Sequence, residues 1–300
     1  MEKRLLITGV SGFAGRYLAP LMVDSGYRVF GTVHSDAELK QDGVEVSYQV
    51  DLRDFNALRH AIQSIKPTHV VHLAAISFVA HENINEIYET NIVGSRNLLK
   101  SLDTLEVKPD AILLTSSANV YGISSQSVFS EIDEVNPAND YAVSKLAMEY
   151  MSRQFLERLN IIIARPFNYT GRGQSENFLI PKIVNHFKKG ADFIELGNTD
   201  VSRDFSDVRT VVEYMKRLIE TPACIANIYN ICSGAPHSLD HIIKTCEKIT
   251  GRNVSVRVNP SFVRRNEIKT LSGNPQKLIN SVGFVNKHPI EETLAWMLNV

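Results

Sequence analysis

The sequence predicts an α/β protein in which a doubly wound parallel sheet is joined to a smaller C-terminal α/β lobe. Three observations support this fold class: β-rich apolar segments alternate with amphipathic helical segments, the first strand runs straight into a glycine-rich turn, and polar motifs follow the ends of strands. Strands that alternate with helices build a parallel sheet, and such sheets bind ligands outside the carboxyl ends of their strands. A chain of 300 residues with 44% hydrophobic content is long enough for one large fold with an appended lobe.

The first strand and its turn lie at the N-terminus. The apolar run that begins at Arg4 passes into Gly9, Gly12 and Gly15, which are spaced every third residue. Glycine permits a tight turn and a close approach of the backbone to a ligand, and the amides at the start of the next helix favour a diphosphate. The spacing differs from the Gly-x-Gly-x-x-Gly dinucleotide fingerprint in its first interval, but the strand-to-helix context is the one that the fingerprint requires. The segment therefore indicates a dinucleotide-binding turn, with a turn of packing glycines as the alternative.

The remaining elements continue the alternation in order along the chain. The expected strands cover residues 28–33, 44–49, 68–73, 111–115 and 161–164, and the expected helices among them cover 54–65 and 84–102. Polar or small residues follow four of these strands, namely Asp51, Ala74-Ala75, Ser116-Ser117 and Pro166-Phe167-Asn168. Because the carboxyl ends of parallel strands meet at one edge of the sheet, we expect these residues to gather there.

The clearest chemical motif is Tyr141-x-x-x-Lys145. Residues four apart on a helix share a face, so the ammonium group of Lys145 would lie beside the phenol of Tyr141. A free phenol has a pKa of about 10. A neighbouring positive charge favours the phenolate and is expected to bring the pKa of Tyr141 down toward the range that suits acid–base catalysis.

Taken together, the motifs resemble those of the extended short-chain dehydrogenases/reductases. They follow the family's order and spacing: Thr8-Gly-x-x-Gly-Phe-x-Gly15, Asp51-Leu52, His72-Leu-Ala-Ala75, Asn91, Ser117 before Val120-Tyr121-Gly122, Tyr141-x-x-x-Lys145 and Arg165-Pro-Phe-Asn168. The resemblance implies a Rossmann fold, a nicotinamide dinucleotide cofactor and, for most members, a nucleotide-linked sugar as substrate.

The resemblance also implies a role for each of three catalytic residues. Tyr141 would exchange a proton with a sugar hydroxyl or carbonyl oxygen, Lys145 would hold the nicotinamide ribose and tune Tyr141, and Ser117 would donate a hydrogen bond to the same sugar oxygen. Donors of this kind are needed where alkoxide charge develops. Ser116 is the competing serine, but Ser117 stands four residues before Tyr121, where the family has its Ser or Thr.

By the same resemblance, the cofactor would be bound by the glycine turn, the strand ends and the catalytic pair. The residues are Gly9, Gly12, Phe13, Ala14, Gly15, Thr32, His34, Asp51, Leu52, Leu73, Ala74, Ala75, Asn91, Tyr141, Lys145, Pro166 and Phe167.

The end of the second strand bears on the choice between NADPH and NADH. No carboxylate stands at positions 32 and 33 to repel a 2′-phosphate, while Thr32, His34 and Ser35 offer donors to one. This favours NADPH, with NADH as the alternative. Asp36 and Glu38 are close enough along the chain to restore an acidic contact if the loop takes a different path.

Three reactions are common in this family. The 4,6-dehydratases carry acidic residues directly after the catalytic Ser or Thr, whereas this chain has Ala118 and Asn119, neither of which can act as a general acid or base. A dehydratase is therefore disfavoured. An epimerase keeps one tightly bound NAD and a reductase exchanges its cofactor at every turnover, so the preference for NADPH favours a reductase.

The C-terminal half resembles most closely the GDP-4-keto-6-deoxy-D-mannose reductases, which make GDP-D-rhamnose. The resemblance rests on residues 168–174, 177–181, 202–209 and 229–234, and on Asn259-Pro260 followed by Arg264-Arg-Asn-Glu267. One departure leaves the reaction open, because Ser117-Ala-Asn-Val-Tyr121 reads more like the sugar 4-epimerases.

This second resemblance implies the substrate-binding residues. Arg203 and Arg264 would neutralise the substrate diphosphate, since planar guanidinium donors fit phosphate oxygens. Glu267 would accept hydrogen bonds from the hydroxyls of the nucleotide ribose, Asn168 would contact the diphosphate, and Ser77 would touch the sugar. The ordinary alternatives are surface ion pairs for the arginines, a turn cap for Asn168 and a helix-start serine for Ser77.

The expected activity is NADPH- or NADH-dependent reduction of the 4-keto group of GDP-4-keto-6-deoxy-D-mannose to GDP-D-rhamnose, in the synthesis of surface-polysaccharide sugars. Reduction of dTDP-4-keto-6-deoxyglucose and nucleotide-sugar 4-epimerisation with tightly bound NAD are the alternatives within the family. A catalytically silent dinucleotide sensor is the alternative outside enzymes. Such relatives usually lose the tyrosine or the lysine, and both Tyr141 and Lys145 are present here.

Two domains are expected to interleave. Residues 1–166 with 208–231 would form the dinucleotide-binding domain, and residues 167–207 with 232–300 would form the nucleotide-sugar lobe. Relatives commonly dimerise through the helix that bears Tyr141 and the helix before it, which implies a homodimer.

Composition restricts the partners. A formal net charge of -1 offers no basic surface for nucleic acid. Three cysteines without Cys-x-x-Cys spacing and nine histidines without ligand spacing indicate neither a disulfide framework nor a metal site. The N-terminus enters the first strand directly and no apolar run reaches ~18 residues, so we expect a cytoplasmic enzyme without a membrane segment.

Overall fold

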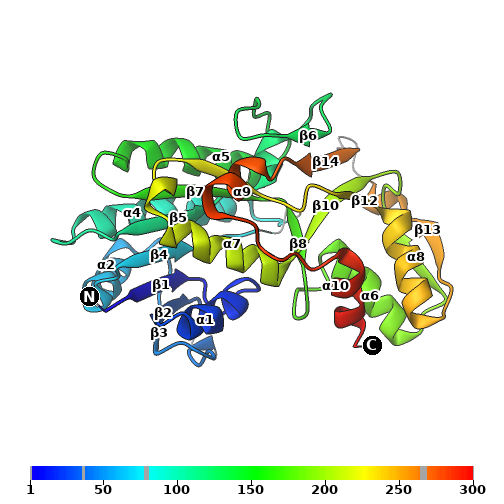
Figure 1. Cartoon of the computed structure of the whole chain (residues 1–300), viewed down its shortest axis with the longest axis horizontal. Helices are drawn as coiled ribbons and strands as arrows, with labels where there is room; N and C mark the ends of the chain where they lie inside the picture. Colours follow the sequence, from blue (N-terminus) through cyan, green and yellow to red (C-terminus); the bar gives the residue numbers. More distant parts are fainter. Residues whose placement is uncertain (1, 36–37, 78–80, 264–268, 300) are drawn as a thin grey trace.

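The computed structural model describes residues 2–35, 38–77, 81–263 and 269–299, and it contains the predicted parallel sheet. The strands lie in the order β11-β7-β5-β4-β1-β2-β3, and every neighbouring pair is parallel. Their bounds are β1 Arg4–Thr8, β2 Arg28–Val33, β3 Val46–Gln49, β4 His69–His72, β5 Ala111–Thr115, β7 Ile161–Pro166 and β11 Ile228–Ile231. The strand order reverses between β1 and β4, which is where doubly wound sheets bind their ligands (Figure 1).

Helices cover both faces of this sheet. The helices α1 (Gly15–Asp24) and α7 (Val208–Glu220) pack on one face. The helices α2 (Phe55–Ile65), α4 (Ser95–Asp103) and α5 (Asp140–Ser152) pack on the other (Figure 1). The large sheet is therefore the middle layer of three, with an apolar core on each side.

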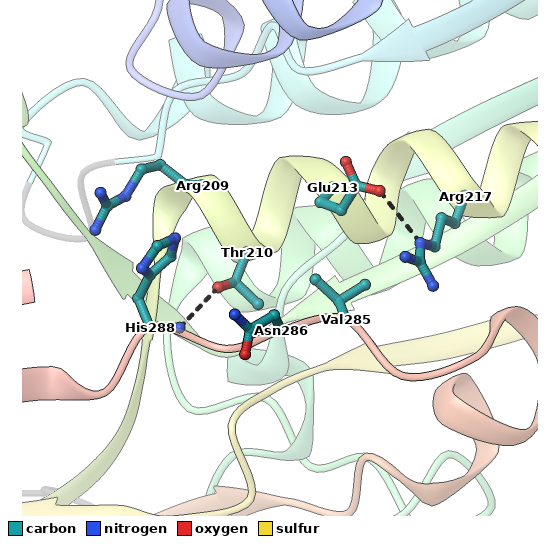
Figure 2. Close-up of a pocket in the computed structure, with 7 residues that line it drawn as sticks. All are labelled: Arg209, Thr210, Glu213, Arg217, Val285, Asn286 and His288. Carbon is teal, nitrogen blue, oxygen red and sulfur yellow. Dashed lines mark hydrogen bonds and ion pairs between the residues drawn. The ribbon is translucent and has the colours of Figure 1, made fainter. Parts of the chain in front are cut away.

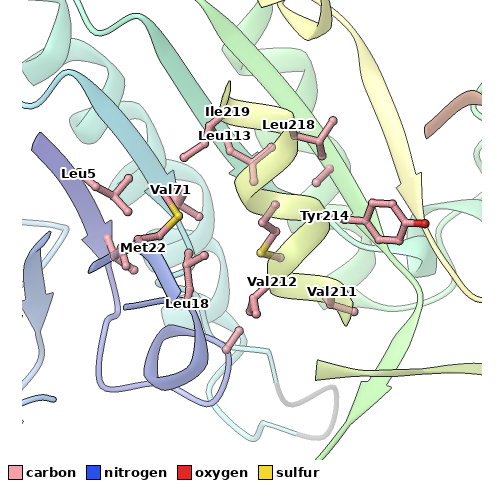
Figure 3. Close-up of a cluster of buried hydrophobic side chains, with 14 of the residues drawn as sticks. Leu5, Leu18, Met22, Val71, Leu113, Val211, Val212, Tyr214, Leu218 and Ile219 are labelled. Carbon is pink, nitrogen blue, oxygen red and sulfur yellow. The ribbon is translucent and has the colours of Figure 1, made fainter. Parts of the chain in front are cut away.

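The alternation of side chains along β1 supplies both cores. Leu5 and Ile7 are fully buried on the side of α1 and α7, while Leu6 is fully buried on the side of α2 and α4. Figure 3 shows the first core, where Leu18 of α1 and Leu218 of α7 converge on the sheet. A strand buried on both faces is apolar throughout, which is why the sequence pattern predicted these strands well.

The predicted helix over 84–102 contains a local change of helix type. It consists of α3 (Ile84–Tyr88), a π-helical turn η2 (Glu89–Gly94) and α4. A π turn adds a residue to the helical repeat and is frequent at functional sites. Here it contains Asn91, one of the predicted cofactor-binding residues.

The second lobe lies at the opposite end of the molecule from the N-terminus (Figure 1). Its main sheet has the order β12-β10-β14-β6, with β8 paired to β10, and a separate pair joins β9 to β13. Its helices α6, α8 and α10 enclose a third apolar cluster. The bounds are β6 Val128–Phe129, β8 Asn168–Thr170, α6 Leu179–Lys189, β9 Phe193–Leu196, β10 Ser202–Asp207, β12 Pro236–Ser238, α8 Leu239–Thr250, β13 Ser255–Val258, β14 Thr270–Gly273 and α10 Ile290–Leu298.

The remaining elements are short helices in the connections between these strands and helices. They are η3 Ala118–Tyr121, η4 Arg153–Phe155, η5 Pro222–Cys224, η6 Pro260–Phe262 and α9 Gln276–Val282.

A buried carboxylate ties the strands of the second lobe together. Asp204 on β10 is fully buried and accepts hydrogen bonds from the backbone amides of Ser233, Gly234 and Gly273 at 2.8, 2.9 and 3.2 Å. The hydroxyl of Ser272 also donates to it at 3.3 Å. A buried charge is tolerated when hydrogen bonds replace its hydration, so Asp204 holds β10 against β14 and the turn that follows β11.

No helix among the described residues is long and apolar enough to cross a membrane.

Candidate active site

The site is built where β5 ends against the start of α5. Ser117 follows β5, and α5 begins after Asn139, whose side chain accepts a hydrogen bond from the amide of Ala142 at 2.9 Å. This cap starts the helix so that Tyr141 lies in its first turn and Lys145 one turn later. Ser117, Tyr141 and Lys145 are 8%, 8% and 3% exposed, so the three predicted catalytic residues are all buried.

Burial dominates the ionisation of the tyrosine. It raises the pKa of Tyr141, and a hydrogen bond with Ser117 opposes that rise. The ammonium of Lys145 donates to the carbonyl oxygen of Thr115 at 2.8 Å. The expectation that the pKa of Tyr141 is brought down toward neutral pH is therefore wrong for this structure, because desolvation disfavours the phenolate and determines the net direction. Tyr141 is a neutral phenol at neutral pH, which suits it to give up a proton rather than to accept one.

The lysine is also shifted by its surroundings. Burial lowers the pKa of Lys145 to about 8, and the carboxylate of Glu149 acts in the opposite direction. A lysine with this pKa still carries its charge at pH 7. The site thus combines a neutral phenol with a nearby buried cation.

The structure separates the two adjacent serines. Ser117 is close enough to Tyr141 to lower the pKa of its phenol, whereas the hydroxyl of Ser116 donates to Glu149 Oε1 at 2.5 Å and is 2% exposed. Ser117 is therefore the serine that faces the reacting phenol, and Ser116 belongs to a buried network behind it.

The glycine turn has the close approaches that its sequence predicted. Gly9 adopts φ of +69°, and a Cβ placed there would lie 2.9 Å from the Cα of Ala74. At Gly15 a Cβ would lie 2.4 Å from the carbonyl oxygen of Val10. These contacts bring the end of β1 against the residues that follow β4 and start α1 directly after the turn. Such a turn fits a dinucleotide diphosphate, because its glycines have no side chain to keep the diphosphate away from the backbone and the amides at the N-terminus of α1 follow directly.

The end of β2 and the loop after it bear on the choice of cofactor. Thr32 is 2% exposed, and its hydroxyl accepts a hydrogen bond from the amide of Gly9 at 3.3 Å, so it faces the glycine turn. His34 is exposed. The hydroxyl of Ser11, inside the glycine turn, donates to Glu38 Oε2 at 2.9 Å. The loop therefore follows the path that places a carboxylate beside the turn, while Asp36 lies outside the described residues.

Asp51 and Leu52 lie at the end of β3, next to that loop. Arg53 hydrogen-bonds the carboxylate of Asp51 through Nε and Nη2, at 3.0 and 2.6 Å, and this lowers the pKa of Asp51. Leu52 is buried and packs against Gly94, where a Cβ would lie 2.8 Å from the Cβ of Leu52.

A chain of hydrogen bonds connects the end of β1 with the helix that bears Tyr141. Thr8 Oγ1 lies 2.7 Å from His72 Nδ1, and His72 Nε2 lies 2.8 Å from Ser95 Oγ, which donates to the carbonyl of Asn91 at 2.7 Å. Because the Ser95 proton is used in that bond, His72 donates through Nε2 and accepts from Thr8 through Nδ1. Burial lowers the pKa of His72 to about 3, so it remains neutral.

Asn91 carries the chain to α5. Its Nδ2 donates to Ser144 Oγ at 2.9 Å, and Ser144 donates to the carbonyl of Tyr141 at 2.7 Å. The amide oxygen of Asn91 accepts from the amide of Ile76 at 2.9 Å, and the residue is 1% exposed. Asn91 therefore positions the segment after β4 and the first turn of α5.

The remaining predicted cofactor residues surround these elements. Phe13 stacks on Tyr169 of β8, with centroids 5.8 Å apart and planes 8° apart. The phenol of Tyr169 is close enough to Tyr141 to interact with it electrostatically. Tyr169 was missed by the sequence reasoning, although it directly follows Asn168 in a motif that was recognised. Ala14 and Phe167 are buried, Leu73, Ala74 and Ala75 are partly buried after β4, and Pro166 ends β7.

The structure describes three of the residues that the sequence predicted only for substrate binding, Asn168, Ser77 and Arg203. Asn168 lies on β8, and its buried Nδ2 has no hydrogen-bond partner among the described residues. Ser77 is exposed after β4, and Arg203 on β10 donates to the carbonyl of Ser202 at 2.9 Å. Arg264 and Glu267 lie outside the described residues. An orphaned buried donor at Asn168 is what a polar ligand or an ordered water would satisfy.

A hollow of about 290 Å³ lies elsewhere, along the outer side of α7 (Figure 2). Its arginines are already paired: Arg217 with Glu213 at 3.2 Å, and Arg209 with Asp207 at 2.8 Å. None of the predicted site residues lines it. It lies where residues 285–288 cross α7, and His288 donates its amide to Thr210 there at 3.5 Å.

Among the described residues, no group of three or more histidine, cysteine, aspartate or glutamate side chains could hold a metal ion. The cysteines Cys224, Cys232 and Cys246 are free and buried.

Two curated relatives match nearly the whole chain. The chain is 34% identical over 281 residues to GDP-6-deoxy-D-talose 4-dehydrogenase of Aggregatibacter actinomycetemcomitans, covering 93% of this chain and 91% of that protein. It is 30% identical over 310 residues to GDP-6-deoxy-D-mannose reductase of Pseudomonas aeruginosa, covering 100% and 97%.

Solved structures agree with the fold. A candidate epimerase from Burkholderia cenocepacia J2315 is 44% identical, with a TM-score of 0.92 over 99% of this chain and 97% of that one. The Pseudomonas aeruginosa protein RMD, solved with NADPH, is 28% identical, with a TM-score of 0.85 over 100% and 97%. The family model described as GDP-mannose 4,6 dehydratase matches residues 6–297. The chain belongs to this family of nucleotide-sugar dehydratases, epimerases and reductases, which have a Rossmann fold and use a nicotinamide dinucleotide.

Proposed function

We propose that this protein reduces the 4-keto group of a nucleotide-linked 4-keto-6-deoxyhexose, with GDP-4-keto-6-deoxy-D-mannose as the leading substrate. The observation that carries the proposal is the buried, neutral phenol of Tyr141, which lies with the buried side chains of Ser117 and Lys145 where α5 begins against the end of β5. Reduction of a ketone needs a proton donor at the oxygen that gains charge, and a neutral phenol can act as one at neutral pH.

The names of the two relatives support one common substrate. Oxidation at C4 of a 6-deoxy-D-talose unit and of a 6-deoxy-D-mannose unit gives the same 4-keto sugar, since the two sugars differ only in configuration at C4. A protein similar to both therefore fits this ketone. GDP-D-rhamnose, which is GDP-6-deoxy-D-mannose, is the product proposed first. GDP-6-deoxy-D-talose is the second candidate product. It is supported by the identity to the talose enzyme, which is 34% against 30% for the mannose enzyme.

The alternatives within the family have less support. A 4,6-dehydratase needs an acid or base beside Ser117, and Ala118 and Asn119 in η3 provide neither. The dTDP-linked ketone and 4-epimerisation with tightly bound NAD remain the rival activities. A silent sensor is disfavoured because Tyr141 and Lys145 are both present.

In the proposed mechanism, the nicotinamide supplies hydride to C4 when it is bound. Tyr141 donates its proton to the oxygen of the carbonyl as that oxygen gains charge, and Ser117 donates a hydrogen bond to the same atom. The charge of Lys145 stabilises the phenolate that remains on Tyr141. Lys145 would also hold the nicotinamide ribose, and Gly9 to Gly15 would hold the diphosphate of the cofactor.

In the second lobe, Arg203 and Arg264 are proposed to bind the substrate diphosphate together with Asn168. Glu267 is proposed to bind the ribose hydroxyls and Ser77 the sugar. The orphaned amide nitrogen of Asn168 supports its part. The proposed domain division is 1–166 with 208–231 and 167–207 with 232–300, although the short strand β6 within the first range pairs with β14 of the second lobe.

We also propose that the protein is a cytoplasmic homodimer that pairs through α5 and the helical segment before it. Three apolar side chains support this interface: Val93, Val143 and Tyr150 are 46%, 38% and 54% exposed. Exposed apolar side chains on two helical segments that pack against each other would be covered by such a contact.

The test of the proposed activity is the absorbance of NADPH and NADH with the two 4-keto sugars offered in parallel. Oxidation of one equivalent of cofactor for each equivalent of the GDP-linked ketone supports the proposal. The H3–H4 proton coupling constant of the sugar then identifies the product. A large coupling indicates GDP-D-rhamnose, and a small one indicates GDP-6-deoxy-D-talose. If the cofactor is oxidised only with dTDP-4-keto-6-deoxyglucose, that ketone is the substrate instead of the GDP-linked one. If neither ketone causes oxidation of the cofactor and the purified protein retains bound NAD, the result would contradict the reductase and indicate an epimerase.

The choice of cofactor is tested at Glu38. The sequence favoured NADPH, but the Ser11–Glu38 hydrogen bond places a carboxylate beside the glycine turn, where it opposes a 2′-phosphate. Glu38→Gln is expected to raise kcat/KM with NADPH relative to NADH by about ten-fold. This is the change that follows from removing a repulsion of about 1.4 kcal/mol between one carboxylate and the 2′-phosphate. Glu45→Gln, which removes an exposed carboxylate paired with Arg28, is the control. An unchanged ratio would show that Glu38 has no part in the preference.

Asn168 is tested by comparison with a second buried asparagine. Asn168→Ala is expected to raise KM for the nucleotide sugar about ten-fold while leaving the free energy of unfolding unchanged, because its Nδ2 has no protein partner to lose. Asn230→Ala should lower that free energy by about 2 kcal/mol, because Asn230 bonds to Tyr121 and to the carbonyl of Phe129. Equal destabilisation in urea unfolding would assign Asn168 to structure.

A further inference from the structure

A buried ion pair lies directly behind the proposed catalytic residues. Glu149, on α5, is 1% exposed, and Arg165, on β7, is 4% exposed. Arg165 donates through Nε to Glu149 Oε1 at 2.9 Å and through Nη2 to Oε2 at 2.7 Å. Such a two-point contact fixes the carboxylate in orientation as well as in position.

The same carboxylate reaches the strand that carries the catalytic serine. Glu149 Oε1 also accepts from Ser116 at 2.5 Å, and Ser116 is the residue before Ser117. On its other side, Arg165 donates to the hydroxyl of Tyr121 at 3.1 Å. Glu149 is therefore linked to both ends of the segment from Ser116 to Tyr121, which contains Ser117.

Glu149 is also one helical turn beyond Lys145. Residues four apart on a helix lie on the same face, and the carboxylate acts on the lysine in the direction that keeps it protonated. Among the described residues, the other titratable groups close to Lys145 are His72 on β4, which interacts with it electrostatically, and Tyr141, one turn earlier on α5. Both are neutral at pH 7, so neither compensates the charge of a buried ammonium.

Stability alone does not account for this pair. Taking two charges out of water costs about as much as their attraction returns, and well-packed apolar residues often replace a buried pair without loss. Here the carboxylate of the pair lies one helical turn from Lys145 and accepts a hydrogen bond from Ser116, the residue before Ser117. We propose that Glu149 is a positioning residue of the active site, which keeps Lys145 cationic and holds the Ser117 segment at the end of β5. The inference rests on the roles of Lys145 and Ser117 in the proposed function.

The test follows the protonation of Lys145 directly, without any sugar substrate. Protein labelled with ¹³C at the lysine Cε is titrated by NMR, and the Lys145 signal is identified by its loss in Lys145→Met. The midpoint in the unaltered protein is expected at about 8, well below that of exposed lysines. In Glu149→Gln, which keeps an oxygen for Ser116 but removes the charge, the midpoint should fall by about one unit, the lower end of the effect of a close opposite charge.

The control is Glu157→Gln, which makes the same change in net charge at an exposed position just after α5. An unchanged midpoint in Glu149→Gln would overturn the proposal. If the single variant does not fold, the double variant Glu149→Gln with Arg165→Met leaves no buried charge unpaired. Because it also removes the cation of Arg165, which acts on Lys145 in the opposite direction to Glu149, its midpoint should fall by less than in the single variant, and the absence of any fall would overturn the proposal. With an active substrate, the alkaline limb of the kcat/KM profile should move to lower pH by the same interval. A fall in the NMR midpoint in a protein that turns over neither ketone would sustain the inference and contradict the proposed function.

Discussion

The structure of the site depends on the burial of the Lys145 ammonium. A lysine that is 3% exposed must replace its hydration with protein partners, and it finds them in the carbonyl of Thr115 and the field of Glu149. The first partner joins α5 to the end of β5, and the second lies on α5 itself. The hydrogen bond that satisfies this buried cation therefore holds the helix that carries Tyr141 against the end of β5, which Ser117 follows.

Hydrogen bonds on the other side of α5 complete the arrangement. The chain from Thr8 through His72, Ser95 and Asn91 reaches the carbonyl of Tyr141 by way of Ser144. It begins at the strand that leads into the glycine turn. The proposed cofactor site and the proposed proton donor are thus parts of one connected polar network inside an apolar protein, and each polar group in it has a partner.

Much of this could be predicted from the sequence. The strands were predicted well because a sheet covered on both faces is apolar throughout, and the glycine turn was predicted because Gly9 needs a positive φ and a bare backbone. Features that depend on tertiary contacts were not predictable: the inward-facing hydroxyl of Thr32 and the stacking of Tyr169 on Phe13. The sequence left open an acidic contact from Asp36 or Glu38, and the fold shows that Glu38 bonds to Ser11. Spacing alone cannot show which way a loop turns or which side of a strand end faces a ligand.

The raised pKa of Tyr141 has the same origin. The Tyr-x-x-x-Lys spacing indicated a nearby cation, but the sequence did not reveal how deeply the phenol is buried or that the lysine bonds elsewhere. Desolvation outweighs the helix-neighbour effect, and the outcome is a proton donor.

The most direct test of this account is the rate of ketone reduction by Tyr141→Phe, with Tyr150→Phe on the exposed face of the same helix as the matched control. The account predicts that loss of the buried phenol lowers kcat by roughly 10²–10⁴-fold, the usual worth of a positioned proton donor, with affinity for NADPH and NADH unchanged. Tyr150→Phe should keep the full rate. Turnover of the ketone by Tyr141→Phe at a rate within a few-fold of the unaltered protein would contradict the central claim that Tyr141 donates the proton.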